Sequence, residues 1–323
     1  MEFRTIIPIE PFKHRIDHSQ HILSLGSCFA DNIASRLADA KFHITASPTG
    51  ILFNPESIAS AIECYANRIY PSITDLQYGN GKWFSLNFHS SFSNADVTLA
   101  LNAMRQGVDR GAEAINKADT YIITFGTAIA YRHIETNKIV ANCHKLPQSH
   151  FQREMLSVDD IVKRYTSLLE SVLKNKRVIF TVSPIRHLSD GLEANSLSKA
   201  ILRVAIGELT RRFPNARYFP SFEIVNDELR DYRFYANDMT HPSQLAIDYI
   251  WERFSDAAFS PSTQKLIERV ARINAAVAHR PFNPESDSYR TFCRRQLEEI
   301  KELENINTEI DWSKEKAYFA NYL

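Results

Sequence analysis

The sequence predicts an α/β fold in three layers, with a parallel sheet between two layers of helices. Short apolar runs alternate along the chain with longer stretches whose apolar residues recur every three or four positions. This alternation is typical of parallel strands joined by crossover helices. Because such crossovers are right-handed, the helices cover both faces of the sheet. Two inserted hairpins and a C-terminal helical extension complete the predicted architecture.

The predicted elements follow one another from the N-terminus. The expected strands are residues 22–25, 42–46, 120–125, 177–182 and 217–219. The first helix covers residues 31–41, with Ile33 and Leu37 on one face. Ser157 and Asp160 have capping-box spacing and open a second helix. Its apolar stripe is Ile161, Tyr165, Leu168 and Val172. A third helix has the stripe Leu197, Ile201, Val204 and Phe213.

Two insertions and a C-terminal helical segment interrupt this alternation of strands and helices. Residues 55–119 contain two helical patterns around a hairpin with its tip at residues 78–81, and residues 128–147 form another hairpin about residues 135–138. We assign residues 1–260 to one domain and residues 261–323 to a C-terminal helical extension. The extension packs on the edge of the domain, caps it, or forms an oligomer contact.

Composition excludes several classes of function. Among 323 residues, 38 Lys and Arg balance 38 Asp and Glu, which argues against a large sequence-independent nucleic-acid surface. The chain shows neither the apolar core of a signal peptide nor a run of ~20 apolar residues that would span a bilayer, so we expect a cytoplasmic protein without membrane partners. Its four cysteines form no CxxC pair, and we predict no metal site and no cofactor.

The most informative residue is Cys28, because ligands of an open parallel sheet bind beyond the carboxyl ends of its strands. Cys28 lies at the turn between the first strand and its helix, where the helix N-terminal amides should lower the pKa of the thiol. The alternative is a small apolar residue that packs the turn. Ser27 is either a neighbouring nucleophile or the N-cap of the helix.

Asp238 and His241 form a D-x-x-H motif beyond the fifth strand. A carboxylate at this spacing can bind one ring nitrogen and set the tautomer, which leaves the other nitrogen to act as a base. The alternative is the capped start of the helix that Pro242 and Ser243 open. Together with Cys28 on the same rim of the sheet, the motif suggests a catalytic triad.

Three motifs carry a resemblance to a known family: GSCFA at residues 26–30, GTA at residues 126–128 and DMTHP at residues 238–242. In these motifs the chain resembles the GSCFA-domain family, which is grouped with the SGNH (GDSL-like) hydrolases. The resemblance covers roughly residues 1–260. It implies a three-layer α/β/α flavodoxin-like (SGNH hydrolase-like) fold and acyl-ester chemistry.

The resemblance implies roles for individual residues. Cys28 takes the nucleophile position, Ser27 replaces an aspartate, and Asp238 and His241 match the last motif. Gly50 resembles the glycine whose amide binds the oxyanion.

The third motif departs from the superfamily pattern. Gly126 and Thr127 are followed by Ala128 where the superfamily has an oxyanion-binding asparagine. Losing one such donor costs about 10²–10³ in rate unless another group replaces it. Asn54, His89 and Asn142 are the candidates.

These observations lead to two hypotheses of function. The first is an acyl-ester hydrolase or acyltransferase that acts through Cys28, His241 and Asp238 on a small-molecule or glycan ester or thioester. Arg186 and His187 follow the fourth strand and either contact an anionic or polar substrate group or form a structural pair. The alternative is an SGNH-like binding or scaffold protein with weak catalysis or none, which the missing asparagine favours.

Overall fold

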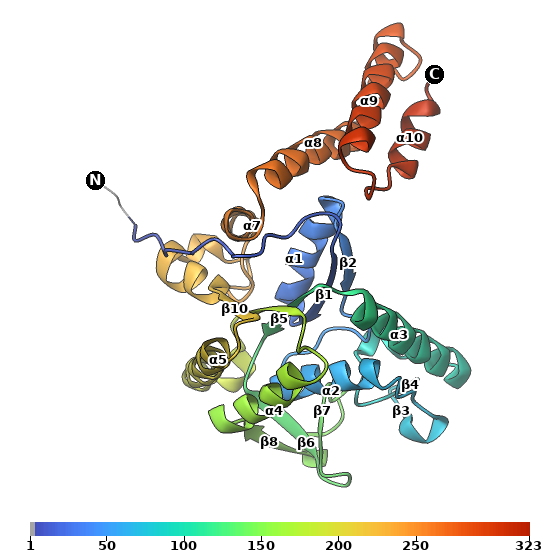
Figure 1. The fold of residues 1–323 in the computed structure, drawn as a ribbon. Coiled ribbons are helices and arrows are strands. Elements are labelled where there is room, and N and C mark those ends of the chain that lie inside the picture. Colours follow the sequence, from blue (N-terminus) through green and yellow to red (C-terminus); the bar gives the residue numbers. More distant parts are fainter. Residues whose placement is uncertain (1–3) are drawn as a thin grey trace.

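A five-stranded parallel sheet forms the centre of the computed structural model, which describes residues 4–323 (Figure 1). Its strands are β1 (His21–Gly26), β2 (His43–Ala46), β5 (Thr120–Phe125), β9 (Arg177–Val182) and β10 (Ala216–Phe219). They lie in the order β10-β9-β5-β1-β2, so the direction of winding reverses between β1 and β5. The predicted α/β class and parallel sheet are confirmed.

Helices cover both faces of the sheet. On one face lie α2 (Pro55–Ala66), α3 (Val97–Lys117), α4 (Val158–Glu170) and α5 (Leu192–Arg212). On the other lie α1 (Cys28–Asp39) and α7 (Gln244–Ala258), together with Ile224 and Val225, which follow the short α6 (Ser221–Glu223). Two apolar cores result. Alternate residues of a central strand enter different cores, as Leu23 and Ile22 of β1 do, which explains why these strands read as continuous apolar runs.

Both inserted hairpins are present. The first pairs β3 (Gln77–Gly79) with β4 (Lys82–Phe84), and the second pairs β6 (Ile129–His133) with β7 (Lys138–Val140). A further strand, β8 (Phe151–Met155), pairs with β6 on its other side and was not predicted. Its residues are largely polar and only partly buried, so no apolar run marks it in the sequence.

Two helices depart from the expected bounds. The first helix begins at Cys28, three residues earlier than predicted, so Cys28 is its first residue. The helix α4 has the predicted capping box, in which Ser157 and Asp160 bond reciprocally, but it ends at Glu170 and leaves Val172 beyond it. The apolar stripe continued past the helix because Val172 packs against the core from the following turn.

The predicted apolar stripe of the third helix is wrong in part. Leu197 and Val204 of α5 are 57% and 53% exposed. The buried face instead carries three polar residues, Asn195, Ser198 and Lys199, before it becomes apolar. The reason is that the first half of α5 packs against loops whose backbone groups need polar partners, and only its second half packs against apolar side chains.

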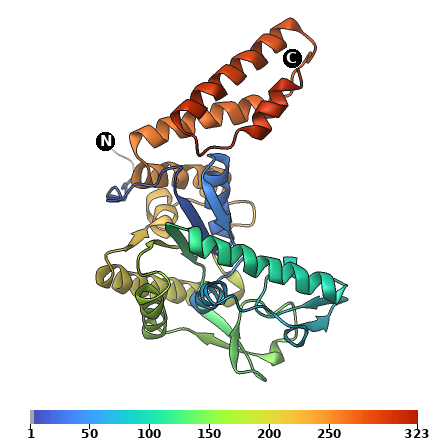
Figure 2. The same cartoon turned by 45° about the vertical axis from the view of Figure 1, so that its right-hand side comes forward.

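The C-terminal extension is a helical unit with an apolar core of its own. It consists of α8 (Pro261–Ala278), α9 (Asp287–Ile306) and α10 (Ser313–Ala320), of which α10 was not predicted, and it projects from one end of the α/β domain (Figure 2). The Lys41 ammonium binds Glu315 at 2.7 Å, and Asn274 donates to the Asp39 carbonyl. No helix among residues 4–323 is long and apolar enough to cross a membrane.

A chain that ends after Ser260 should remain folded. The interactions between the extension and the domain are peripheral: Ile267 of α8 packs against the core that α1 and α7 share, Lys41 pairs with Glu315, and the Lys41 ammonium lies over the Trp312 ring. We therefore expect the truncation to lower the unfolding free energy by about 1–2 kcal/mol. Thermal unfolding followed by circular dichroism measures this. A truncated chain without a cooperative transition would show that the extension is part of the domain's core.

Candidate active site

The first strand ends in a turn that delivers Cys28 to the carboxyl edge of the sheet. Gly26 closes β1 with φ +141°, and Ser27 takes the N-cap position of α1. A Cβ atom on Gly26 would lie 2.2 Å from the Thr124 carbonyl oxygen of β5. Because no side chain fits there, the glycine allows the backbone that presents Cys28 to approach the neighbouring strand.

Gly26→Ala should therefore destabilise the fold by about 3 kcal/mol through steric overlap and backbone strain. Gly81→Ala is the matched control, since Gly81 also has positive φ but has open space around it. It should cost about 1 kcal/mol. Urea unfolding measures both, and equal losses would mean that close packing at Gly26 is not what requires glycine.

Cys28, His241 and Asp238 lie together. The Cys28 Sγ is 3.8 Å from the His241 Nε2, although the two residues are 213 positions apart in the chain. The His241 Nδ1 is 2.6 Å from the Asp238 Oδ2. Since Nδ1 faces a carboxylate it carries the proton, and Nε2 is left as the acceptor that faces the sulfur. The Thr240 hydroxyl also contacts Nδ1 at 3.0 Å, a contact that was not predicted.

Asp238 is held as a carboxylate. The backbone amides of His241 and Thr240 donate to its Oδ1 at 3.0 and 2.9 Å. These two bonds and the His241 ring hold the pKa of Asp238 well below its usual range. The motif thus caps its own turn and orients the imidazole, so the two readings of D-x-x-H are compatible.

The expected lowering of the Cys28 pKa is wrong in direction. Burial raises the pKa of the thiol, and the backbone amides of Cys28 and Phe29 oppose this shift without overcoming it. The helix N-terminus therefore acts as expected, but the loss of hydration around the sulfur outweighs it. A thiol in this environment needs a base to become a nucleophile, and His241 is the base within reach.

Ser27 is 1% exposed, and its hydroxyl has no hydrogen-bond partner among residues 4–323. It occupies the N-cap position but makes no capping hydrogen bond through its side chain. The predicted N-cap role is therefore confirmed for the position of Ser27 but not for its side chain. Ser27 is the buried residue of the turn that presents Cys28.

Gly50, Gly126 and Thr127, three residues predicted to bind the oxyanion or the substrate, have backbone amides that are already bonded. The Gly50 amide donates to the Ser47 carbonyl at 2.7 Å, and the Gly126 and Thr127 amides both donate to the Phe53 carbonyl. The role expected for Gly50 does not hold in this geometry, because a turn uses its amide. Gly126 and Thr127 instead join the end of β5 to the segment after β2.

The three candidate replacements for the missing asparagine lie in different places. Asn54 follows Phe53 and caps α2, accepting from the Ser57 amide at 2.8 Å. His89 lies against Gly50, and its Nδ1 accepts from the Ser91 amide. Asn142 bonds to His144 on an inserted segment, and no hydrogen bond among residues 4–323 joins it to Cys28 or His241.

Arg186 and His187 lie beside the D-x-x-H loop. The Arg186 amide donates to the Thr240 carbonyl at 3.2 Å, and its guanidinium stacks on Tyr235 at 4.1 Å. Burial, together with the charges of Lys199 and His241, lowers the pKa of His187 to about 4. The His187 imidazole is therefore neutral near neutral pH, and its Nε2 has no hydrogen-bond partner among residues 4–323.

The polar part of the buried face of α5 was not predicted. The Asn195 Oδ1 accepts from the His187 amide, and the Ser198 Oγ accepts from the Ala128 amide at 2.7 Å. Lys199 donates to the Gly126 and Ser183 carbonyls. The sequence does indicate this buried polar face, because Asn195, Ser198 and Lys199 are spaced so that they share one side of the helix.

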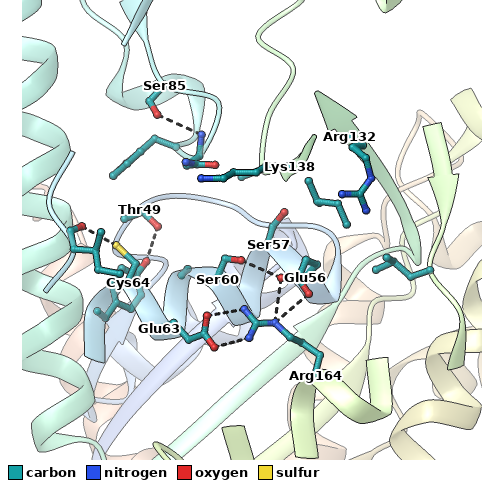
Figure 3. A pocket seen from close by; sticks show the side chains of 18 of the residues that line it. Thr49, Glu56, Ser57, Ser60, Glu63, Cys64, Ser85, Arg132, Lys138 and Arg164 are labelled. Carbon is teal, nitrogen blue, oxygen red and sulfur yellow. Dashed lines mark hydrogen bonds and ion pairs between the residues drawn. The ribbon is translucent and has the colours of Figure 1, made fainter. Parts of the chain in front are cut away.

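Two pockets lie near the loops of this edge. A polar pocket of about 1150 Å³ lies between α2, α4 and the β6–β8 sheet, where Arg164 pairs with Glu56 and Glu63 (Figure 3). Neither Cys28 nor His241 lines it. A second pocket of about 590 Å³ is lined by Asp31, Gly50 and His89. Asp31 lies three residues after Cys28 on α1, but neither Cys28 nor His241 lines the second pocket.

The comparison with known families agrees with the motifs that build this site. Residues 21–254 match the model of the GSCFA family. The chain belongs to the GSCFA family. Residues 270–323 match a second model, described as GSCFA domain protein, C-terminal domain. No curated protein matches the chain. The family match includes Cys28, Asp238 and His241, and the second match covers α9, α10 and part of α8.

Proposed function

We propose that this GSCFA-family chain is an acyl-transfer enzyme in which Cys28 is the nucleophile, His241 the general base and Asp238 the residue that orients His241. The observation that carries the proposal is the series of contacts from Cys28 through His241 to Asp238, at 3.8 and 2.6 Å. A nucleophile, a base with a free nitrogen and a carboxylate on its other nitrogen are the parts that covalent acyl transfer needs.

The proposed reaction has two steps. His241 Nε2 takes the thiol proton as Cys28 Sγ attacks the carbonyl carbon of an ester or thioester. The tetrahedral intermediate collapses to an acyl-cysteine, and the leaving group departs with the proton from His241. His241 then takes a proton from water or from a hydroxyl of a second substrate, which attacks the acyl-cysteine and restores the thiol. Water makes the chain an esterase, and a small-molecule or glycan hydroxyl makes it an acyltransferase.

The oxyanion donors differ from those expected from the sequence. We assign one oxyanion contact to the Cys28 amide at the helix N-terminus, whereas the Gly50 amide is engaged by its bond to Ser47. We assign the place of the missing asparagine to Asn54 or to the neutral His187, because both lie beside Phe53 and Gly126.

The strand order supports the placement of the fold near the SGNH hydrolases. Counted along the chain, the five parallel strands lie in the order 2-1-3-4-5, which is that of flavodoxin-like sheets. Ligands of such sheets bind where the order reverses, here between β1 and β5. Cys28 follows β1 and Gly126 follows β5.

Hydrolysis of aryl esters and acyl thioesters by the purified chain tests the proposal. We expect turnover that depends on Cys28 and is unaffected by Cys143→Ala, since Cys143 lies on an inserted segment. Iodoacetamide near neutral pH should also label Cys28 faster than Cys64, Cys143 and Cys293. Burial raises the pKa of Cys64 and of Cys143 to about 11, and the Cys64 thiol donates to a carbonyl rather than to a base.

The second candidate function is a binding or scaffold protein without turnover. It is favoured by the engaged amides of Gly50, Gly126 and Thr127, which leave fewer oxyanion donors than an efficient hydrolase uses. This function predicts that all four thiols react with iodoacetamide at similar slow rates and that no ester is hydrolysed above the rate of the Cys28→Ala variant.

A further inference from the structure

A lysine is buried beneath the carboxyl edge of the sheet. Lys199 of α5 is 1% exposed, and no carboxylate among residues 4–323 forms an ion pair with it. Burying an ammonium group without an opposite charge is costly, so such a residue is rare unless its charge is used. Neither the family motifs nor the proposed triad includes it.

Lys199 ties together the ends of two strands. Its Nζ donates to the Gly126 carbonyl at 2.5 Å and to the Ser183 carbonyl at 2.7 Å. Gly126 follows β5 and Ser183 follows β9, which are neighbours in the sheet. Gly126 packs against Ser27, where a Cβ on the glycine would lie 3.3 Å from the serine Cβ. The ammonium therefore lies one layer below the turn that carries Cys28.

Hydrogen bonding alone does not require a charge at this position. Asn195 and Ser198, on the same face of α5, satisfy neighbouring loop amides with neutral side chains. A neutral donor would likewise satisfy the two carbonyls that Lys199 binds. The positive charge thus needs a separate explanation, which its titratable neighbours provide.

The groups that act electrostatically with Lys199 are Cys28 on α1 and His187 after β9, and the Phe222 ring covers the ammonium at 5.9 Å. Burial lowers the pKa of Lys199 to about 7, and a negative charge on Cys28 opposes that shift. Burial raises the pKa of Cys28, and Lys199 is among the groups that oppose it. The two sites therefore favour each other's charged forms.

We propose that Lys199 is a positioning residue of the Cys28 site, whose buried positive charge favours negative charge on the sulfur and on the adjoining oxyanion. The inference rests on the proposed function. The same charge compensates for the asparagine that the third motif lacks, because the Lys199 ammonium binds the Gly126 carbonyl at the start of that motif.

Lys199→Gln tests the proposal, because glutamine keeps a hydrogen-bond donor and removes the charge. Cys28 is alkylated with iodoacetamide and the labelled peptide is quantified by mass spectrometry. Lys199 is charged below pH 7, so at about pH 6 the wild type should react about tenfold faster than the variant, and at about pH 9 the two rates should converge. A purely structural role gives a rate ratio that does not change with pH, and that result would overturn the proposal.

Lys176→Gln is the matched control. Lys176 also donates to a backbone carbonyl, that of Ala118 at 2.6 Å, but Ala118 ends α3 and precedes β5, so it lies at the opposite edge of the sheet. Its replacement should leave the labelling of Cys28 unchanged. Lys199→Met is compared with Lys199→Gln, with thermal unfolding of each. If neither folds, Lys199 is required by the structure itself and the proposal is contradicted.

Labelling needs no turnover, so the two proposals can fail separately. A pH-dependent rate ratio in a chain that neither hydrolyses an ester or thioester nor forms an acyl-cysteine with one would refute the proposed function and leave the electrostatic role of Lys199. Ester turnover that requires Cys28, together with a constant ratio, would refute only the role of Lys199.

Discussion

Cys28→Ala should reduce acyl transfer to the background rate, a loss of about 10³-fold or more in kcat/KM. Alanine fits the first position of α1 and removes only the sulfur, so the fold and its thermal transition should be preserved. Cys28→Ser should retain little activity, because a hydroxyl needs much stronger base assistance than a thiol does. Initial rates with an aryl acetate and an acetyl thioester measure both variants.

Ser27→Ala is the control for Cys28. The Ser27 hydroxyl is buried and has no hydrogen-bond partner among residues 4–323, so its loss should leave the rate close to that of the wild type. Full activity in Cys28→Ala together with an inactive Ser27→Ala would show that the nucleophile is one residue earlier and that the contact of Cys28 with His241 has no catalytic role.

His241→Ala should slow acylation by about 10³–10⁴-fold, because burial raises the pKa of Cys28 and no other base contacts the sulfur among residues 4–323. Asp238→Asn should also lower the rate strongly, since the amide can stabilise the wrong tautomer of His241. The pKa of Asp238 is depressed, so it stays ionised through the acidic range, and its own protonation should not reduce activity between about pH 5 and pH 7.

Met239→Ala is the control on the same loop. Met239 is exposed and lies between Asp238 and His241 in the chain, and the hydrogen bonds of the Asp238 carboxylate go to the Thr240 and His241 amides instead. It should leave the rate nearly unchanged. If His241→Ala keeps full ester turnover and an unchanged pH profile of Cys28 labelling, the D-x-x-H motif serves only to cap the turn before α7.

The layered fold was predictable because its central strands, β1, β5 and β9, are buried on both faces and appear in the sequence as continuous apolar runs. The start of α1 was less so, because Cys28 to Ala30 lack a periodic pattern that separates turn from helix. The apolar stripe of α5 misled for a physical reason. Leu197 and Val204 are exposed, whereas polar residues of the same helix are buried where loop backbone needs partners.

The candidate site, like the fold, was predictable only in part. The motifs placed Cys28, Asp238 and His241 on one rim, since residues that follow parallel strands meet at one edge of the sheet. Hydrogen bonds between loops distant in sequence were not predictable, and they engage the Gly126 and Thr127 amides with the Phe53 carbonyl. Burial is also a property of the folded chain, which is why the direction of the Cys28 pKa shift was wrong and Lys199 was missed.

Trapping the acyl-enzyme tests the central claim most directly. The chain is mixed with an activated acetyl ester or thioester, quenched in acid, digested and mapped by mass spectrometry. We predict one acetyl group on the peptide that contains Cys28, formed rapidly in the wild type and slowly in His241→Ala. Acetylation spread over lysines or over the other three cysteines, at rates that His241→Ala does not change, would contradict the claim that Cys28 is the nucleophile.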